Sequence, residues 1–444
     1  MWKHIRNLVL ILIVIALGII WYLSRPDAAQ VPESKLVGPD PQITEGREQV
    51  IPTMKVAEVA RWSAEGKPVA APGLVVERYA GGLDHPRNLY VLPNGDVLVA
   101  ETNSPPRDFA GIKGWVEKRL MTKAGAVTKS ANRIMLLRDM DGDGKPELKT
   151  AFLTGLNSPF GMVLIGDMLY VANTDAVLAF PYKEGDTQII AKGTKLVSLN
   201  AVKPNNHWTR NLAASADGQT LFISVGSNSN IGENGLDKEA GRAQVLAYNF
   251  KTKKLGTYSS GLRNPVGLAW DSSGVLWTVV NERDMLGSDM VPDYLAEVEF
   301  GADYGWPQHY WGGYVDFRVQ PQDLEKRQYE KRPAYALGAH TAPLGLAFAD
   351  NAKLGGSFTN GAFVARHGSW NRQPLAGYDV IFVPFKDGRP TGKPITLLSG
   401  FLTKDGKAQG RPTMLAVAKD GSLLVSDDVG NVIWRVRAAT VSAK

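Results

Sequence analysis

One strand–turn–strand pattern recurs six times after about residue 73, and this repeat constrains the fold more than any other feature. Each copy has a polar loop, an apolar run of strand length, a turn with Gly or Asp, and a second apolar run. Repeats of this kind are typical of propeller blades. We therefore expect an all-β fold, a six-bladed β-propeller over residues 73–440. A two-sheet sandwich is the alternative, which six copies with one layout disfavour. The copies begin near Leu83, Leu156, Asn205, Gly261, His340 and Gly410.

The first 24 residues predict a transmembrane signal-anchor helix. Lys3 and Arg6 precede an uninterrupted apolar run from Leu8 to Leu23, and Arg25 follows it. A basic flank before an apolar stretch is the pattern of a secretory signal. The run ends in bulky residues, which indicates that it stays attached; a cleaved signal peptide is the alternative. Because positive charge remains in the cytoplasm, we expect the rest of the chain to be periplasmic and anchored to the inner membrane.

Residues 25–72 have the composition of a linker. Polar residues dominate the stretch, and prolines interrupt it repeatedly. Such a segment predicts a tether that holds a globular head away from the membrane. Among these prolines are Pro26, Pro32, Pro39, Pro41 and Pro52.

Composition excludes several kinds of function. The chain has no cysteine, which excludes disulfides, thiolate catalysis, cysteine-ligated zinc and iron–sulfur clusters. The net charge is +6, but the basic residues are not interleaved with aromatic ones in any run, so we expect no nucleic-acid partner.

Basic side chains recur in the loops that lead into the first strand of each repeat. In a propeller these loops meet at one mouth of the central channel, where ligand sites form. A purely structural loop needs Gly, Pro, Asn or Asp rather than His or Arg. Three of the six histidines of the chain nevertheless lie in these loops. The polar residues concerned are His85, Arg87, His207, Arg263, Asn264, His340 and Arg411.

This ring of Arg and His predicts an anion-binding pocket that contains a general base. Converging positive charges attract a small polyanion, and Arg binds carboxylate or phosphate groups through two parallel hydrogen bonds. The same charges lower the pKa of a neighbouring histidine, so its imidazole is neutral and can accept a proton near pH 7. The residues alone do not identify the anion.

Four segments resemble the sugar dehydrogenases that depend on pyrroloquinoline quinone (PQQ), a family that includes soluble glucose dehydrogenase and the sorbosone dehydrogenases. The resemblance covers about residues 73–437. It implies a propeller that oxidises an aldose or a related hydroxyaldehyde and passes electrons to a quinone or a cytochrome. The segments are LDHPRN at 83–88, GLRNPVGL at 261–268, GADYGWP at 301–307 and GSWNR at 368–372.

The resemblance also implies roles for individual residues. His207 is the general base that takes the proton of the substrate's anomeric hydroxyl while hydride passes to PQQ, and Arg263 polarises the quinone oxygen. PQQ, a tricarboxylate, binds with a calcium ion that contacts the backbone carbonyls of Arg283 and Asp284. The residues expected to bind PQQ are Asn264, His340, Arg411, Arg87 and Arg366, with His367 as the alternative to Arg366.

Two departures from glucose dehydrogenase favour the sorbosone branch. In the glucose enzyme an Asp orients the catalytic histidine, whereas the matching residue here is Ser227. We expect Asn228 or Glu233 to orient His207 instead. In addition, Glu-Arg-Asp at 282–284 replaces a turn that contains Gly-Pro in the glucose enzyme.

A separate acidic loop, DMDGDGKPE at 139–147, predicts a structural calcium site. Asp139, Asp141 and Asp143 alternate before Gly as in the first half of a calcium loop. The twelfth position is Thr150 rather than Glu, so the loop is no EF-hand, and a plain Asp/Gly-rich turn is the alternative.

Two other functions remain open from the sequence. The first is a six-bladed metal-dependent lactonase, although hydrolases of that kind use carboxylate and Asn ligands rather than Arg and His. The second is a non-catalytic binding propeller, which the serine at position 227 keeps in consideration.

Overall fold

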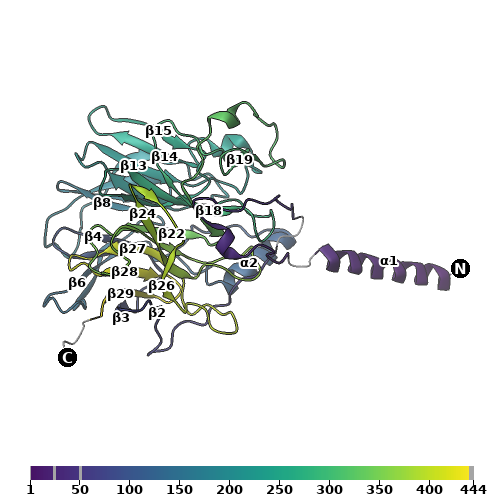
Figure 1. Cartoon of the computed structure of the whole chain (residues 1–444), viewed down its shortest axis with the longest axis horizontal. Helices are drawn as coiled ribbons and strands as arrows, with labels where there is room; N and C mark the ends of the chain where they lie inside the picture. The colour runs from purple at the N-terminus through teal and green to yellow at the C-terminus, as the bar shows by residue number, and fades with distance from the viewer. Residues whose placement is uncertain (1, 24–26, 50–52, 440–444) are drawn as a thin grey trace.

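The computed structural model describes residues 2–23, 27–49 and 53–439, so Arg25, Pro26 and Pro52 lie outside the described residues. Six large sheets make up the head of the molecule (Figure 1). The first strand of each sheet contacts the first strands of its neighbours, and the later strands follow outward in antiparallel order. This arrangement confirms the predicted six-bladed β-propeller.

Blades 1 to 3 are each built from four consecutive strands. Blade 1 contains β4 (Pro86–Val91), β5 (Val97–Glu101), β6 (Arg133–Arg138) and β7 (Leu148–Leu153). Blade 2 contains β8 (Met162–Ile165), β9 (Met168–Ala172), β10 (Ala176–Pro181) and β11 (Thr194–Ser198). Blade 3 contains β12 (Arg210–Ala214), β13 (Thr220–Val225), β14 (Gln244–Asn249) and β15 (Lys254–Ser260).

Blades 4 to 6 each take their outermost strand from the N-terminal part of the chain. Blade 4 contains β16 (Pro265–Trp270), β17 (Leu276–Val280), β18 (Pro292–Glu297), β21 (Tyr335–Ala339) and β1 (Val37–Gly38). Blade 5 contains β22 (Pro343–Phe348), β23 (Gly361–Arg366), β24 (Asp379–Lys386), β26 (Ile395–Ser399) and β2 (Val69–Ala70), and β25 (Arg389–Pro390) pairs with β24. Blade 6 contains β27 (Pro412–Val417), β28 (Leu423–Asp427), β29 (Val432–Ala438) and β3 (Leu74–Gly81).

The remaining described elements lie outside the blades. They are the helices α1 (Trp2–Leu23) and α2 (Gly111–Lys123), the 3₁₀ turns η1 (Glu33–Lys35), η2 (Leu236–Glu239) and η3 (Lys326–Tyr329), and the short hairpin of β19 (His309–Tyr310) and β20 (Tyr314–Val315). The hairpin and η3 belong to a long insertion between β18 and β21 of blade 4.

The first strands approach one another closely at the axis because glycine gives them room. A Cβ atom on Gly345 of β22 would lie 2.5 Å from the carbonyl oxygen of Thr413 in the next blade. A Cβ atom on Gly161 would lie 2.6 Å from the backbone nitrogen of Leu212. Both positions therefore require glycine for the close approach rather than for a turn. Four apolar side chains pack together in this region: Phe160, Val266, Leu344 and Met414.

The ring is closed by strands from the two ends of the propeller sequence. β3 pairs antiparallel with β29, from the Gly81–Val432 pair to the Leu74–Ala438 pair. Closure of this kind holds the first and last parts of the sequence in one blade and covers the outer edge of β29.

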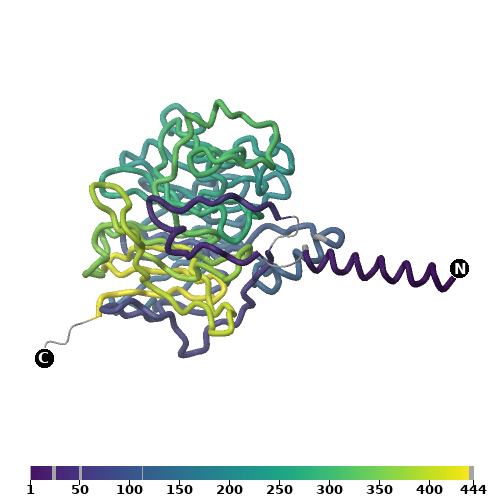
Figure 2. Tube along the Cα trace, turned by 45° about the vertical axis from the view of Figure 1, so that its right-hand side comes forward, coloured from purple at the N-terminus to yellow at the C-terminus, as the bar shows by residue number. Residues whose placement is uncertain are grey.

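The segment predicted to be a linker is packed along the propeller. We call residues 27–49 and 53–62 the N-terminal strap; Figure 2 shows this part as a dark purple tube lying across blades 4 to 6. Trp62 donates a hydrogen bond from Nε1 to Asp427 Oδ2 at 2.7 Å and packs against the rings of Phe401 and Trp434. The strap is thus part of the head, although the boundaries of the three predicted domains stay a prediction.

Helix α1 projects from the head and is exposed along its length (Figure 1). Residues Trp2–Tyr22 are long and apolar enough to cross a membrane, with none of that window buried. An exposed apolar helix near the N-terminus is compatible with a signal anchor and with a signal peptide.

The close approach at the axis makes a testable prediction. Gly345→Ala should lower the free energy of unfolding by about 3 kcal/mol, because the added Cβ meets rigid backbone of the next blade. Gly256→Ala is the matched control: this exposed strand residue has no atom within 4 Å of an added Cβ, so its stability should change by less than about 0.5 kcal/mol. Equal denaturation midpoints for both variants would contradict the argument.

Candidate functional site

The mouth is the end of the propeller where two sets of loops meet. Successive strands in a blade run antiparallel, so the loop before the first strand and the loop after the second strand open at the same end. The ring of basic residues predicted from the repeat belongs to the first set, whereas Ser227, residues 282–284 and Arg366 belong to the second. The strap also lies at this end, because it bonds to the loops after β17 and β23. Helix α2 lies there too, within the loop between β5 and β6.

His207 stands just before β12 with one ring nitrogen engaged. Its Nδ1 atom lies 2.9 Å from both the carbonyl oxygen and the Oγ of Ser227. Ser227 Oγ donates its own proton to the carbonyl of Ser229 at 2.6 Å, so both Ser227 oxygens accept from His207 Nδ1–H. The Nε2 atom then carries the lone pair and forms no hydrogen bond with the described residues. This tautomer makes His207 a proton acceptor at Nε2.

Ser227, rather than Asn228 or Glu233, therefore orients His207. The Asn228 amide donates to the carbonyl of Val202 at 2.6 Å. The Glu233 carboxylate accepts from the backbone of residues 230 and 231. Neither side chain hydrogen-bonds to the imidazole, so the expectation that one of them replaces the missing aspartate is wrong.

The environment of His207 keeps its imidazole neutral. Burial, and then the positive charge of Arg263, hold the pKa of His207 well below its usual value of 6.5. The charges of Arg242 and Arg107 act in the same direction. The hydrogen bond to the Ser227 carbonyl acts in the opposite direction, but no carboxylate is hydrogen-bonded to the ring, and His207 is uncharged at pH 7.

Two buried arginines fix the backbone that carries His207. Arg242 donates from Nη2 to the carbonyls of His207 and Ser227, at 2.7 and 2.9 Å. Arg210 donates from Nη1 to the same His207 carbonyl at 2.8 Å. These charge-assisted hydrogen bonds hold the ring and its serine partner in one geometry.

Arg263 is buried beside this group, and its donors are fully used. Nε and Nη2 donate to the backbone carbonyl and side chain of Asn230, at 3.0 and 2.8 Å. Nη1 donates to the carbonyls of Asn281 and Glu282, and Nη2 also pairs with Asp284 Oδ2 at 3.0 Å. Arg263 therefore has no free N–H to donate to a quinone oxygen, and it could polarise that oxygen only through its charge.

Gly226 brings Asn264 next to His207. A Cβ atom at position 226 would lie 2.3 Å from Asn264 Oδ1 and 2.6 Å from His207 Cβ. Asn264 Oδ1 is buried and has no hydrogen-bond partner among the described residues. Buried polar atoms are nearly always paired, so an unpaired one beside a candidate base marks a place for a ligand donor.

Two predicted cofactor ligands are occupied by the protein itself. His340 contacts a backbone carbonyl through Nε2 at 2.9 Å and Asp284 Oδ1 through Nδ1 at 3.4 Å. Although burial opposes it, the hydrogen bond to Asp284 raises the pKa of His340. Arg366 is paired with both oxygens of Asp379, at 2.7 and 2.6 Å, and with Glu33 of the strap. In this structure His340 supports Asp284, and Arg366 joins the strap to blade 5.

Asp428 is the centre of a second group on the other side of the mouth. It accepts from Arg87 Nη1 at 2.7 Å and lies 3.0 Å from His367 Nε2 and 3.5 Å from His85 Nε2. Burial lowers the pKa of both histidines, that of His367 to about 4, so both are neutral at pH 7. Arg87 balances the charge of Asp428, and its guanidinium lies 5.5 Å over the ring of Trp208, the neighbour of His207.

Arg87 of this second group and the nearby Arg411 fit a ligand that carries carboxylates. Arg87 Nε and Arg411 Nε are buried donors without partners among the described residues. The Arg411 side chain has one neutral partner, the hydroxyl of Tyr378 at 3.2 Å, and no ion pair within the described part of the chain. Unpaired buried donors on arginine suit the carboxylates of PQQ. On the opposite side of the mouth, His207 and Asn264 have polar atoms that are unpaired among the described residues.

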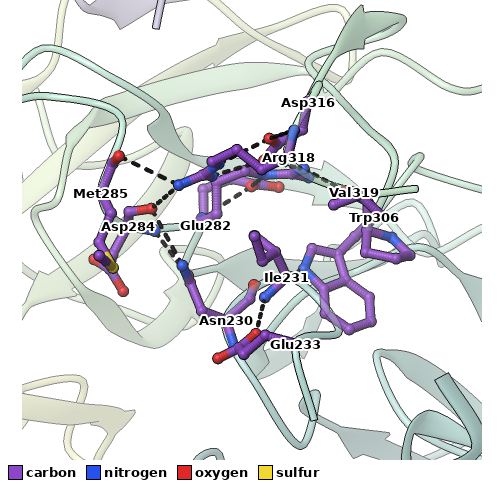
Figure 3. A network of polar contacts seen from close by, with 12 residues as sticks. Asn230, Ile231, Glu233, Glu282, Asp284, Met285, Trp306, Asp316, Arg318 and Val319 are labelled. Carbon is purple, nitrogen blue, oxygen red and sulfur yellow. Dashed lines mark hydrogen bonds and ion pairs between the residues drawn. The ribbon is translucent and has the colours of Figure 1, made fainter. Parts of the chain in front are cut away.

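The predicted calcium site on the carbonyls of Arg283 and Asp284 does not fit. The Asp284 carbonyl already accepts from Arg318 Nη1 at 3.1 Å and from Asn230 Nδ2 at 3.2 Å, which uses both of its lone pairs. Arg318 Nη1 also reaches the carbonyl of Met285 at 3.2 Å (Figure 3). Calcium needs six to eight oxygen ligands, and here a guanidinium supplies the positive charge instead.

A groove of about 1120 Å³ lies beside this network, between strap residues 43–48 and the blade 4 insertion. Asp316 and Arg318 line it, and both belong to the network in Figure 3. Tyr310 and Tyr314 stack on each other at its wall with ring centres 5.8 Å apart. Stacked tyrosines next to charged groups are suited to polyhydroxyl ligands.

The acidic loop at 139–147 lies away from the mouth, in the turn between β6 and β7. Ligand atoms of its four carboxylates lie within 4.8 Å of one another. The residues are Asp139, Asp141, Asp143 and Glu147. A calcium ion at this loop stays a prediction.

The sequence did not indicate Asp428 or Arg318, and it indicated Ser227 and Asp284 in other roles. Ser227, Asp284 and Asp428 lie just after the second strands β13, β17 and β28. Polar residues at the ends of second strands were the available signal. The loops after the second strands reach the same mouth as the loops before the first strands. Arg318 had no such signal, since it comes from an insertion without a repeat.

The neutral state of His207 can be tested through its partner. Ser227→Asp should raise the pKa of His207 by about 1 pH unit or more, because a carboxylate next to Nδ1 stabilises the imidazolium. Ser227→Asn, which has nearly the same shape without the charge, should leave the pKa close to that of the unmodified protein. Histidine NMR titration of the three proteins measures the effect, and identical titrations would contradict the assignment of Ser227 as the Nδ1 partner.

Comparison with known proteins finds relatives over most of the chain. A PQQ-dependent pyranose dehydrogenase of Coprinopsis cinerea is 25% identical over 428 residues, covering 83% of this chain and 54% of that protein. The chain thus spans about half the length of that relative. An uncharacterized protein of Borreliella burgdorferi is 28% identical over 292 residues, covering 63% of this chain and 76% of that protein.

Solved structures share the fold. The holo PQQ domain of Coprinopsis cinerea pyranose dehydrogenase has a TM-score of 0.67 at 21% identity and covers 86% of this chain and 100% of that domain. The PQQ-bound aldose sugar dehydrogenase of Streptomyces coelicolor has a TM-score of 0.55 at 18% identity, with coverages of 84% and 100%. The sequence family described as TrAA12-like matches residues 68–293 and 315–439, and the chain belongs to this family.

Proposed function

We propose that this chain is a PQQ-dependent dehydrogenase that oxidises an aldose or a related hydroxyaldehyde. The observation that carries the proposal is the free Nε2 of a neutral His207 in a mouth whose Arg87 and Arg411 have unpaired buried donors. The TrAA12-like family and the PQQ-dependent relatives support the same reading. The choice of substrate, including the sorbosone branch, stays a prediction.

In this proposal the residues of the mouth have the following roles. Arg87 and Arg411 bind carboxylates of PQQ, and Asn264 contacts its ring system near His207. PQQ, when bound, supplies the acceptor for the hydride of the substrate. His207 takes the hydroxyl proton of the substrate at Nε2, and Ser227 keeps Nδ1 protonated during the transfer. The charge of Arg263 favours negative charge that develops in the site.

A metal-dependent lactonase is less well supported. Among the described residues, the one group of three or more His, Asp or Glu side chains close enough to hold a metal is the loop of Asp139, Asp141, Asp143 and Glu147. That loop lies away from the mouth. We keep it as a structural calcium site, separate from the reaction.

The location of the enzyme follows from α1. We infer that α1 anchors the chain in the inner membrane and that the head is periplasmic, where a quinone or a cytochrome accepts the electrons. The exposed apolar surface of α1 supports this anchor.

The function is tested by reconstitution with PQQ. The full chain in detergent should bind PQQ and reduce an artificial dye with at least one aldose. His207→Asn keeps an amide N–H for Ser227 but has no base, so it should bind PQQ equally well and lose kcat by about 100-fold or more. Ser272→Ala, in the exposed turn between β16 and β17, is the control and should keep full activity. Failure of the unmodified chain to bind PQQ would overturn the cofactor assignment.

The role of Arg318 gives a further prediction. A chelator should leave the dissociation constant for PQQ unchanged, because a guanidinium rather than calcium binds the carbonyls of Asp284 and Met285. Arg318→Met should lower stability by about 1–3 kcal/mol, since it removes the charge-assisted hydrogen bonds to the carbonyls of Asp284 and Met285 and the ion pair with the buried Asp316. Arg327→Met, at an exposed arginine that lines the same groove, should be close to neutral. PQQ binding that a chelator abolishes and calcium restores would contradict this assignment.

A further inference from the structure

We propose that the mouth of the propeller lies against the surface of the bilayer that holds α1, with α2 as a second, peripheral contact. This rests on the anchoring role of α1 proposed above and goes beyond it by naming the face that meets the membrane. The occupant of this face is a lipid surface with acidic headgroups.

The first argument is the length of chain between the anchor and the mouth. α1 ends at Leu23, and residue 27 is already fixed to the mouth: Asp27 Oδ2 accepts from Ser288 N at 2.7 Å, in the loop after β17. Two positions four residues apart are separated by at most about 15 Å. Whatever the angle of α1, its end therefore lies within that distance of the mouth.

The second argument is that the strap cannot extend to let the head swing away. Gln30 N donates to Asp289 Oδ2 at 2.8 Å, and Ala29 N donates to the carbonyl of Gln373 at 2.7 Å. Further along, Asn371 Nδ2 donates to the carbonyl of Thr53 at 2.8 Å. Hydrogen bonds to the mouth loops of blades 4 and 5 begin at Asp27, four residues after the end of α1. The mouth therefore cannot move far from the end of α1.

The third argument is the surface of α2, which shares the mouth end with α1 (Figure 1). Ile112 and Trp115 are 85% and 63% exposed. Large apolar side chains next to basic ones suit the headgroup region, where Trp is favoured and acidic lipids attract cations. Three exposed basic residues accompany them on the helix: Lys118, Arg119 and Lys123.

α2 is held next to the candidate base. Arg107, just before the helix, donates to the carbonyl of Asn206, the neighbour of His207, at 3.2 Å. At its other end, the carbonyl of Lys123 accepts from Val59 N of the strap at 3.2 Å. On the blade 4 side, Phe317 is 78% exposed beside Arg318. Exposed apolar side chains thus flank the mouth on two sides and would contact the lipid. A soluble sugar would enter the mouth from the side, between the head and the membrane surface.

The absence of cysteine in the chain allows a clean test. Trp115→Cys would carry an environment-sensitive fluorophore in the full chain, reconstituted in vesicles of phosphatidylethanolamine and phosphatidylglycerol. Lipids with a nitroxide near the headgroup should quench this probe at least about threefold more than one at Ser272→Cys, an exposed residue at the opposite end. Ile112→Cys is the second variant, should the first not fold.

The outcomes separate this proposal from the proposed function. Protein that floats with the vesicles can show equally weak quenching of the probe on α2, at position 115 or 112, and of the probe at position 272. That result would overturn the membrane-facing mouth. Protein that does not float would overturn the anchor together with the orientation. The measurement needs neither PQQ nor substrate, so failure of PQQ binding would overturn the dehydrogenase alone.

Discussion

The close approach of the six first strands at the axis is the constraint on which the rest of the structure depends. Glycine at positions 161 and 345 allows backbone of adjacent blades to come together where a methyl group would not fit. This spacing brings loops from all blades to one mouth. Charged residues that are hundreds of positions apart, such as Arg87 and Asp428, are thereby held at hydrogen-bond distance.

Nearby guanidinium groups, and the lack of a carboxylate hydrogen-bonded to the ring, then determine the protonation state of His207. A buried imidazole near Arg263, Arg242 and Arg107 loses its proton readily, and Ser227 supplies two oxygen acceptors without supplying charge. An aspartate at the same place would also orient the ring, but it would raise the pKa of the imidazole. Serine gives a weaker base whose lone pair stays available at lower pH.

The repeat pattern was sufficient to predict the blades, because alternating apolar runs and turns encode strands locally. It also indicated His207, Asn264, Arg87 and Arg411, since these precede the first strands. The pattern could not reveal that the donors of Arg263 and Arg366 are consumed by the protein, because their partners lie in other loops and in the strap. Nor could composition distinguish a packed strap from a free linker: proline-rich polar sequence suits both, and the difference lies in partners such as Asp427 for Trp62.

The strap would also connect the proposed anchor with the proposed site. The segment that follows α1 supplies the edge strands β1 and β2 to blades 4 and 5 and buries Leu36 and Val37. Releasing it would expose those edges and leave Arg366 without Glu33. If α1 anchors the chain as proposed, the contacts that stabilise the propeller would also fix the position of the membrane relative to the mouth. Orientation of the head toward the bilayer would then need no further contacts, because the segment that follows α1 already completes the edges of blades 4 and 5.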